Sequence, residues 1–504
     1  MSFSTLPFLF YFLPAFLAVY YIVPARFRNA VLALGSLLFY WLGAGTGALL
    51  VLVALILVNF AAGRLIEGAH GDERRAWLIL ALACDVGSLF YFKYMGWFLE
   101  NLGRLTNTDF FFFRVALPLG VSFYVFQSIA YVADVYRGDA EAERSLLDYA
   151  AFQAMFPQLV MGPILRLRDV SAELHTKRPF SRAAVESGFS LFVVGLGCKV
   201  VLADQLASLW TALERIGFAY LSTPLAWFGA VGYSLQLYYD FAGYSLMAMG
   251  LARMLGFVIP RNFDLPYCSR SISEFWRRWH ITLGAWMRDY VFYPLSLSKA
   301  FGRLSRWART HIRGTGGKIF ATSLATFIVY LIIGIWHGAN FRYIAFGLWN
   351  GVLITASLLL ERTFLRWKSA LHINDKSAAW RVFMTLRTML LVFIGRYFTR
   401  SPRLSCVLRF LKTTVLHPQP SQLLDGTLLS FGLAKTDFLV IALGLAVLLT
   451  LECLQERGVQ IRAALEKRPG FVQWLAVTAL LLAVLLLGVF RAGYIPSGFI
   501  YTQF

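Results

Sequence analysis

The sequence predicts an all-α, polytopic membrane protein. Of its 504 residues, 58% are hydrophobic and only 15% are charged, whereas soluble domains carry about 25% charged residues. The apolar residues occur in long runs separated by basic loops. A helix of about 20 apolar residues crosses the roughly 30 Å hydrocarbon core and satisfies its own backbone hydrogen bonds there. We therefore expect a bundle of helices in the bilayer.

Apolar runs of spanning length occur about twelve times. In chain order, they lie near residues 6–24, 30–46, 48–63, 76–98, 115–134, 186–203, 225–252, 318–336, 342–361, 381–398, 436–454 and 471–490. The first run has no charged segment before it and no small-residue cleavage site, so we expect it to be retained as a span. Pro157, Gly162 and Pro163 interrupt a further apolar stretch, which is typical of a re-entrant segment.

The positions of Lys and Arg predict the orientation, because cytoplasmic loops carry the excess of positive charge. Basic residues follow the first, third and fifth runs, whereas none precedes the first run or follows the second. We therefore expect the N-terminus outside, loops 253–318 and 455–469 inside, and the last residues outside. The same alternation assigns the stretch 399–435 to the outer side of the membrane, although it holds five basic residues. We therefore expect part of it to form an interfacial helix.

Composition excludes several classes of function. The five cysteines are scattered without a Cys-x-x-Cys pair, which argues against a disulfide framework or a zinc site. No Walker loop is present, so nucleotide-driven transport has no support. Basic cytoplasmic loops that attract anionic headgroups explain most of the net charge of +20, and we expect no nucleic-acid partner. Residues 253–318 hold twelve Lys/Arg against three acids, which is more than orientation requires.

Two histidines, His280 and His337, lie where a membrane-spanning chain tolerates few ionisable groups. Such groups are functional by default, and an imidazole can remove a proton from an attacking hydroxyl near neutral pH. The alternative is that both are hydrogen-bonded interior or interfacial residues. For the intramembrane carboxylate of Asp240, we expect a structural partner ahead of a catalytic role. Four other histidines are expected to be solvated surface residues: His175, His311, His372 and His417.

Residues 262–297 are expected to form short amphipathic helices rich in tryptophan and arginine. A helix capped by Ser273 would place Trp276 and His280 beside its apolar face. Such helices suit the membrane interface, and their guanidinium groups can bind the phosphates of a donor. Interfacial anchoring is the alternative for each arginine. The candidate donor-binding residues are Arg277, Arg278 and Arg288.

Four motifs resemble those of the membrane-bound O-acyltransferase (MBOAT) family. They are Arg-Trp-His-Ile-Thr-Leu (278–283), Gly-Ile-Trp-His-Gly-Ala-Asn (334–340), Tyr-Tyr-Asp-Phe-Ala-Gly-Tyr-Ser (238–245) and Phe-Pro-Gln-Leu-Val-Met-Gly-Pro-Ile-Leu-Arg (156–166). The resemblance is strongest to alginate-acetylating members, and D-alanylating members are a more distant branch. It implies a helical bundle with re-entrant or interfacial helices around a central tunnel. It also implies that His337, in Trp-His-Gly, is catalytic and that His280 is the second histidine of the tunnel.

The same resemblance implies the reaction partners. The expected donor is an acyl thioester, either acetyl-CoA or an acyl carrier protein, and no bound metal or prosthetic group is expected. A periplasmic partner on the outer face is expected to complete transfer to the polymer. We accordingly divide the chain into an acyltransferase core at 1–400, an outer loop, span and cytoplasmic loop at 401–470, and a final helix with a tyrosine motif at 471–504.

Two further features bear on the acceptor. Alginate-type members have a Gly-Gly-Asn-Arg turn where this chain has Pro-Leu-Ser-Leu-Ser-Lys (294–299), which argues against alginate itself. The C-terminus resembles the small partner peptide of teichoic acid D-alanylation, whose Phe-x-Tyr-x-x-Phe pattern is matched by Phe499, Tyr501 and Phe504. A phenol leaves more readily than an aliphatic alcohol, so Tyr501 is a candidate catalytic relay. An aromatic interfacial anchor is the alternative.

These features predict a transmembrane O-acyltransferase of the bacterial inner membrane, which passes an acyl group, expected to be acetyl, outward to a cell-surface polysaccharide. His337 is the expected general base, and His280 is expected to orient the donor or assist proton transfer. One alternative is D-alanyl transfer from a carrier protein. An alternative of another class is a lipid-linked sugar transporter or flippase, although the inverted repeats that mark many such folds are not found.

Overall fold

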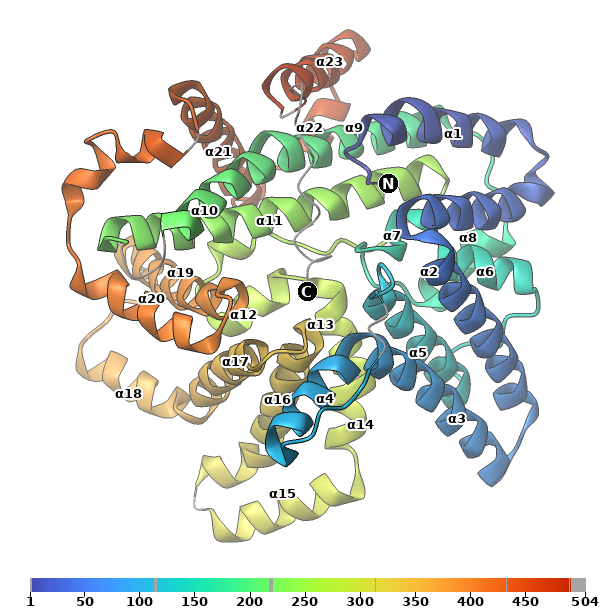
Figure 1. Ribbon diagram of the computed structural model, residues 1–504, viewed down its shortest axis with the longest axis horizontal. Coiled ribbons are helices and arrows are strands. Elements are labelled where there is room, and N and C mark those ends of the chain that lie inside the picture. The colour runs from blue at the N-terminus through green and yellow to red at the C-terminus, as the bar shows by residue number, and fades with distance from the viewer. Residues whose placement is uncertain are drawn as a thin grey trace. The chain divides into compact units, whose positions relative to one another are not determined.

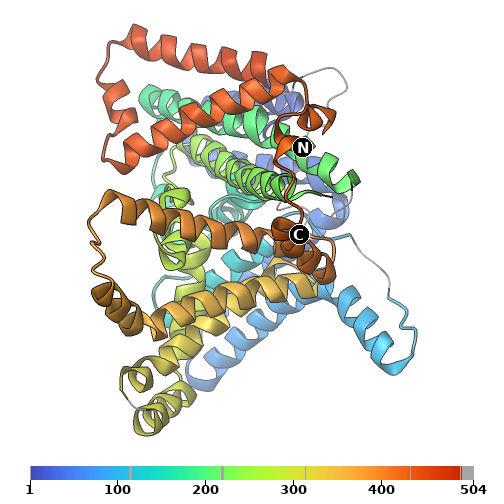
Figure 2. The ribbon, with the colours of Figure 1, turned by 90° about the vertical axis from the view of Figure 1, so that its left-hand side faces the viewer.

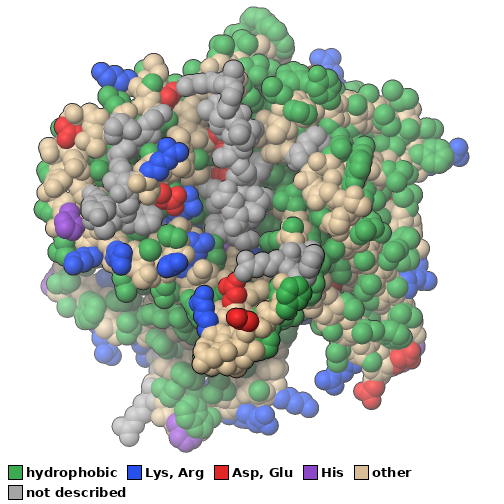
Figure 3. Space-filling view, viewed as in Figure 1, with side chains coloured by type: hydrophobic (Ala, Val, Ile, Leu, Met, Phe, Trp, Pro, Cys, Tyr) green, Lys and Arg blue, Asp and Glu red, His purple; other side chains and the backbone are tan. Residues whose placement is uncertain are grey.

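The computed structural model describes residues 2–112, 116–216, 221–312, 314–431, 433–488 and 490. Across these residues the chain is helical, and the only extended pairing is an isolated antiparallel bridge between Phe263 and Trp279. Eight helical stretches within the described ranges are long and apolar enough to cross a membrane. Figure 3 shows hydrophobic side chains on much of the visible surface. The expected all-α membrane architecture is therefore confirmed.

The chain divides into two compact units, each assembled from separate stretches of sequence. Unit 1 contains Met1–Asp204, Tyr238–Arg261 and Glu466–Phe504, and unit 2 contains Gln205–Leu237 and Asn262–Leu465. The helices of unit 1 (Figure 1) are α1 (Leu13–Ile22), α2 (Arg28–Gly68), α3 (Gly71–Leu89), α4 (Met95–Thr106), α5 (Val121–Arg137), α6 (Leu146–Ala154), α7 (Phe156–Leu159), α8 (Leu167–His175), α9 (Arg182–Gly197) and α23 (Gly470–Leu487).

Helix α11 (Thr223–Met254) contributes to both units. The helices that lie wholly or mainly in unit 2 are α10 (Asp204–Ile216), α12 (Ile272–Arg278), α13 (Ile281–Met287), α14 (Tyr293–Ser296), α15 (Lys299–His311), α16 (Thr315–His337), α17 (Phe341–Leu359), α18 (Glu361–Ala370), α19 (Ala378–Arg400), α20 (Leu404–Leu416), α21 (Lys435–Glu456) and α22 (Ile461–Glu466). Figure 2 shows α15 folded back against α16.

The eight spans are fewer than the twelve expected, and the sequence explains the difference. The runs 30–46 and 48–63 form two helical halves of α2, which are separated by non-helical backbone at Gly45, where φ is 82°, and which together count as one of the eight stretches. The first run gives only a short apolar helix, Phe8–Ile22. The remaining two runs form α5, which has only 17 residues, and α11, which is interrupted by polar side chains.

In unit 1, glycines allow α9 to pack closely against the end of α11. A Cβ atom added at Gly188 would lie 2.5 Å from the carbonyl oxygen of Gly250, and one at Gly195 would lie 2.5 Å from that of Gly243. The two glycines on each helix are seven residues apart, so they recur on one face. Small residues of this kind let helix backbones approach in the absence of a hydrophobic driving force between them.

An ionic group is buried in unit 1, where the chain continues from α9 through a π-helical turn at Cys198–Ala203. The Lys199 ammonium lies 2.7 Å from a carboxylate oxygen of Asp204 and 2.7 Å from one of Asp240. All three side chains are at most 2% exposed. Buried charges require such partners, so the expectation of a structural partner for Asp240 is confirmed.

The interrupted apolar stretch around Pro157 and Gly162 is also in unit 1. It forms the single-turn helix α7 followed by irregular backbone, and every residue from Ala151 to Leu165 is buried. Irregular backbone at membrane depth is tolerated where protein surrounds it. The structure thus shows the expected interruption between α6 and α8, and the re-entrant character of this segment stays a prediction.

In unit 2, α16 and α17 form a hairpin around another close glycine contact. A Cβ atom added at Gly334 would lie 2.5 Å from the backbone oxygen of Tyr343 and 2.7 Å from the Cα atom of Gly347. Asn340 caps α17, since its side chain accepts a hydrogen bond from the Arg342 N–H at 3.1 Å. This hairpin fixes the end of α16, where His337 lies.

Candidate functional site

His280 lies at a sharp break between α12 and α13 rather than on a continuous helix. Its φ and ψ are 48° and 54°, which is left-handed backbone that L-residues adopt rarely. The cap of α12 is Ser271, whose hydroxyl accepts a hydrogen bond from the Glu274 N–H at 3.1 Å. The expected cap at Ser273 and a helix continuing through His280 are therefore wrong. The break turns the imidazole inward, and the residue is 1% exposed.

Asn262 fixes the tautomer of His280. The Asn262 Oδ1 atom lies 3.0 Å from His280 Nδ1 and accepts hydrogen bonds from the backbone N–H and the hydroxyl of Thr282, at 3.2 and 3.0 Å. A backbone N–H can only donate, so this amide atom must be the oxygen. His280 therefore donates from Nδ1, and its Nε2 atom carries the lone pair in the neutral ring.

Electrostatics also favour the neutral form of His280, which lies outside the eight candidate spans. Burial lowers the pKa of His280 well below the ordinary value of 6.5, and the nearby His337 lowers it further. Transfer of a charged imidazolium into an apolar site is costly, which is the physical cause of the shift. A buried neutral imidazole can accept a proton or position a polar group.

His337 is the last residue of α16 and is 6% exposed. Its ring centroid lies 5.6 Å from that of Phe346 and 6.3 Å from that of Tyr343, both on α17. The Trp336 ring lies 5.0 Å from His337 and 6.2 Å from His280. The structure thus brings the two histidines predicted from the sequence into one aromatic environment within unit 2.

A cavity of about 250 Å³ lies beside His280 in unit 2. Its walls include His280 and Arg288, together with apolar side chains from α13 and α16 such as Leu283 and Val329. Trp276 closes part of the wall and is held by a hydrogen bond from its Nε1 atom to Asn350 Oδ1 at 3.0 Å. His337 is not among the residues that line this cavity. The cavity is small and mostly apolar, with a histidine and an exposed arginine in its wall.

The three arginines singled out from the sequence have different surroundings. Arg277 and Arg288 are exposed, and only Arg288 lines the cavity. The Arg278 guanidinium binds Glu456 at 2.6 and 3.0 Å and Glu274 at 2.8 Å. The hydrogen bonds that Arg278 donates to Glu456 raise the pKa of Arg278, so this guanidinium stays charged and paired with carboxylates.

Sequence reasoning missed two residues of the site and, elsewhere in the chain, one contact of a surface histidine. Asn262 and Asn350 hold His280 and Trp276, but a single asparagine gives no signal of its partner. Tyr501 lies outside the described residues, so its surroundings are not described. His175 is exposed, as expected, but its Nε2 atom also lies 2.9 Å from the buried carboxylate of Glu143, a contact that the sequence did not indicate.

Comparison with known proteins identifies the class. The family model of the membrane-bound O-acyltransferase family matches residues 140–394, a range that includes both histidines. The chain belongs to this family and is a multi-pass membrane O-acyltransferase.

Individual relatives narrow the similarity. The chain is 40% identical over 425 residues to a probable alginate O-acetylase of Pseudomonas aeruginosa, which covers 81% of this chain and 74% of that protein. It is 31% identical over 453 residues to a peptidoglycan O-acetyltransferase of Helicobacter pylori, and the match covers 82% of this chain and 80% of that protein. A teichoic acid D-alanyltransferase of Streptococcus thermophilus is 27% identical over 296 residues, and the match covers 55% of this chain and 67% of that protein.

Proposed function

We propose that this protein is an O-acetyltransferase of the bacterial inner membrane that passes acetyl groups from a cytoplasmic thioester toward a cell-surface polysaccharide. The observation that carries the proposal is the cavity of about 250 Å³ between α13 and α16, with His280 and Arg288 in its wall. Ligand pockets for drug-sized molecules are typically about 300–1,000 Å³. The smaller volume suits a short acyl group, and similarity to O-acetylating relatives supports acetyl.

In the proposed reaction, His337 is the general base. It removes the proton of the attacking hydroxyl as the new C–O bond forms at the thioester carbonyl. The C–S bond then breaks, and the leaving thiolate takes the proton from the imidazolium. A positioned base contributes about 10²–10⁴ in rate. His280, whose Nδ1–H is committed to Asn262, orients the donor or assists this proton transfer.

His337→Ala is the first test. We expect loss of acetyl transfer by about 10²–10⁴ in a protein that still inserts and elutes as wild type. His372→Ala, at a surface position in the turn before α19, is the matched control and should retain full activity. Full activity in a well-expressed His337→Ala protein would contradict the role of general base.

Arg288 is the proposed donor contact, because its guanidinium is exposed at the cavity wall and can bind a phosphate. Arg288 pairs with the neighbouring Asp289 at 3.0 Å but keeps a 56% exposed side chain, whereas Arg278 binds two carboxylates and is 20% exposed. We expect Arg288→Ala to raise the KM for the thioester donor. Added salt should also raise the donor KM of the wild type, because it screens the contact between the guanidinium and the phosphate. Arg278→Ala should instead lower thermal stability. An unchanged donor KM in Arg288→Ala would remove this residue from the donor site.

We also propose that Tyr501 is the first acceptor, and that its aryl ester passes the acetyl group to an outer-face partner. Tyr501→Phe removes one oxygen and keeps the ring, so it separates the relay from an aromatic anchor. Normal polymer acetylation in Tyr501→Phe would contradict the relay.

D-alanyl transfer from a carrier protein is the second candidate, supported by the similarity to a teichoic acid D-alanyltransferase. Mass spectrometry of surface polymers from wild-type and deletion strains distinguishes the two, because acetyl and alanyl groups differ in mass. An acetyl increment lost on deletion would support our proposal, and an alanyl increment would overturn it.

A further inference from the structure

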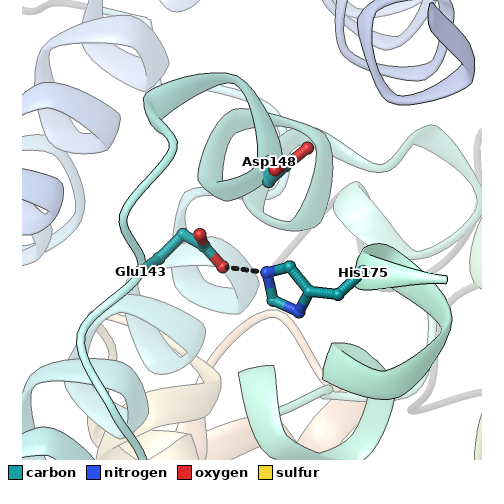
Figure 4. Close-up of side chains that lie close together, drawn as sticks. All are labelled: Glu143, Asp148 and His175. Carbon is teal, nitrogen blue, oxygen red and sulfur yellow. Dashed lines mark ion pairs between the residues drawn. The ribbon is translucent and has the colours of Figure 1, made fainter. Parts of the chain in front are cut away.

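Three side chains of unit 1 converge outside the acyl-transfer site. Glu143 lies just before α6, Asp148 is in the first turn of α6, and His175 is the last residue of α8. One carboxylate oxygen from each acid and one imidazole nitrogen all lie within 4.8 Å of one another. Figure 4 shows Glu143 and His175 pointing toward each other, whereas the Asp148 carboxylate, in the first turn of α6, points to one side of their contact.

The hydrogen bonding of His175 orients its lone pair toward Glu143. The His175 Nδ1 atom lies 2.8 Å from the backbone oxygen of Ser171, four residues earlier in α8. A carbonyl oxygen only accepts, so Nδ1 carries the proton. In the neutral ring, the lone pair of Nε2 then faces the Glu143 carboxylate oxygen at 2.9 Å. Two electron-rich atoms at this distance require a positive charge between them, either a second ring proton or a cation.

The two carboxylates are oriented by hydrogen bonds to their oxygen atoms, as the carboxylate ligands of metal ions usually are. The Glu143 side chain is 4% exposed, and its other oxygen accepts hydrogen bonds from the Arg144 and Ser145 N–H groups at 2.8 and 3.1 Å. Asp148 Oδ1 accepts a hydrogen bond from Asn29 Nδ2 at 2.6 Å. Bonds of this kind orient metal ligands, as does a histidine N–H donated to a backbone carbonyl.

We propose that Glu143, Asp148 and His175 bind a divalent transition-metal ion, with Zn²⁺ as the best match. Two carboxylates and one neutral imidazole carry a charge that matches a divalent cation. This ligand set suits zinc, which takes nitrogen and oxygen ligands at about 2.0–2.2 Å in tetrahedral geometry. Small rotations would open the 2.9 Å contact to the roughly 3.4 Å that such ligands require. Because His175 is 48% exposed, an ion can enter from solvent, which would fill the fourth position.

The metal would act as a clamp on the re-entrant segment. Glu143 and Asp148 precede the buried stretch that contains α7, and His175 follows it. A single ion would therefore tie together the two ends of that stretch, at a site separate from His280 and His337. The expected role is structural, so metal binding should raise thermal stability, because a ligand that binds only the folded state stabilises it.

The test uses the full-length protein in detergent, stripped with a chelator and titrated with Zn²⁺. We expect about one equivalent to bind, and Co²⁺ to give the visible absorption of a four-coordinate site. His175→Gln, Glu143→Gln and Asp148→Asn should each weaken binding more than about tenfold and abolish the Zn²⁺-dependent rise in melting temperature.

His311→Gln is the matched control. The Nδ1 atom of His311 also lies near the carbonyl oxygen four residues earlier, that of Trp307, at 2.9 Å. Among the described residues, however, His311 has no carboxylate at ion-pair distance. This variant should bind Zn²⁺ as the wild type does. Binding of well under one equivalent, or equal binding in wild type and in folded His175→Gln, would show that Glu143 and His175 form only an ion pair.

Discussion

Replacing Asn262 tests whether one oxygen atom sets the state of His280. Three donors converge on Asn262 Oδ1: His280 Nδ1, the Thr282 N–H and the Thr282 hydroxyl. In Asn262→Ala the hydroxyl can rotate to a new acceptor, but the other two donors are buried and fixed. A stranded buried donor costs about 1–3 kcal/mol, so for two donors we expect a loss of about 2–6 kcal/mol in unfolding free energy.

The effect on activity should exceed the effect of a general loss of stability. Without Asn262, the Nδ1–H tautomer loses the acceptor at 3.0 Å that favours it, and His280 can present the wrong nitrogen to the cavity. We expect acetyl transfer to fall by about 10²-fold at a temperature where the variant remains folded. Thr282→Val is the control, because it removes only one of the three hydrogen bonds, at a cost of about 0.5–1.5 kcal/mol, and leaves the tautomer fixed.

Thermal unfolding in detergent and single-turnover acetyl transfer measure the two effects separately. If Asn262→Ala kept both its melting temperature and its turnover, the hydrogen-bonding argument would be refuted. Equal damage in Thr282→Val and Asn262→Ala would show that the local fold, rather than the tautomer, limits activity.

The remaining predictions concern pH and packing. The pKa of His280 is lowered in the folded protein, so the unfolded chain binds more protons than the folded chain below the ordinary pKa near 6.5. The contribution of His280 to stability is therefore complete above that pH. It is lost as the pH falls below that value, by up to about 1.4 kcal/mol per pH unit. His280→Gln should flatten this acid dependence of the melting temperature, and an unchanged profile would contradict the shift. Gly334→Ala should destabilise by about 1–3 kcal/mol and reduce activity, since the added Cβ meets backbone atoms of Tyr343 and Gly347. Gly302→Ala, which meets no atom within 4 Å, should be neutral or stabilising by up to about 1 kcal/mol, and equal melting temperatures for the two variants would contradict the close packing of α16 and α17.

The sequence alone determined the class of this protein. Membrane insertion depends on the summed hydropathy of consecutive residues, which is a local property, so the helical spans could be predicted, and eight stretches among the described residues are long and apolar enough to cross a membrane. The motifs around His280 and His337 were also contiguous, and they led to the family that the comparison confirmed. The roles of both histidines and of Tyr501 remain predictions.

Tertiary structure decided what these residues contact. The tautomer of His280 depends on Asn262, 18 positions earlier, and the pairing of Arg278 depends on Glu456, 178 positions later. Likewise, only the fold shows that the exposed side chain of His175 contacts the buried Glu143. These hydrogen bonds, ion pairs and buried contacts form between residues that are distant in the chain. Hydropathy and short motifs describe only neighbouring residues, so they cannot predict which distant residues meet in space.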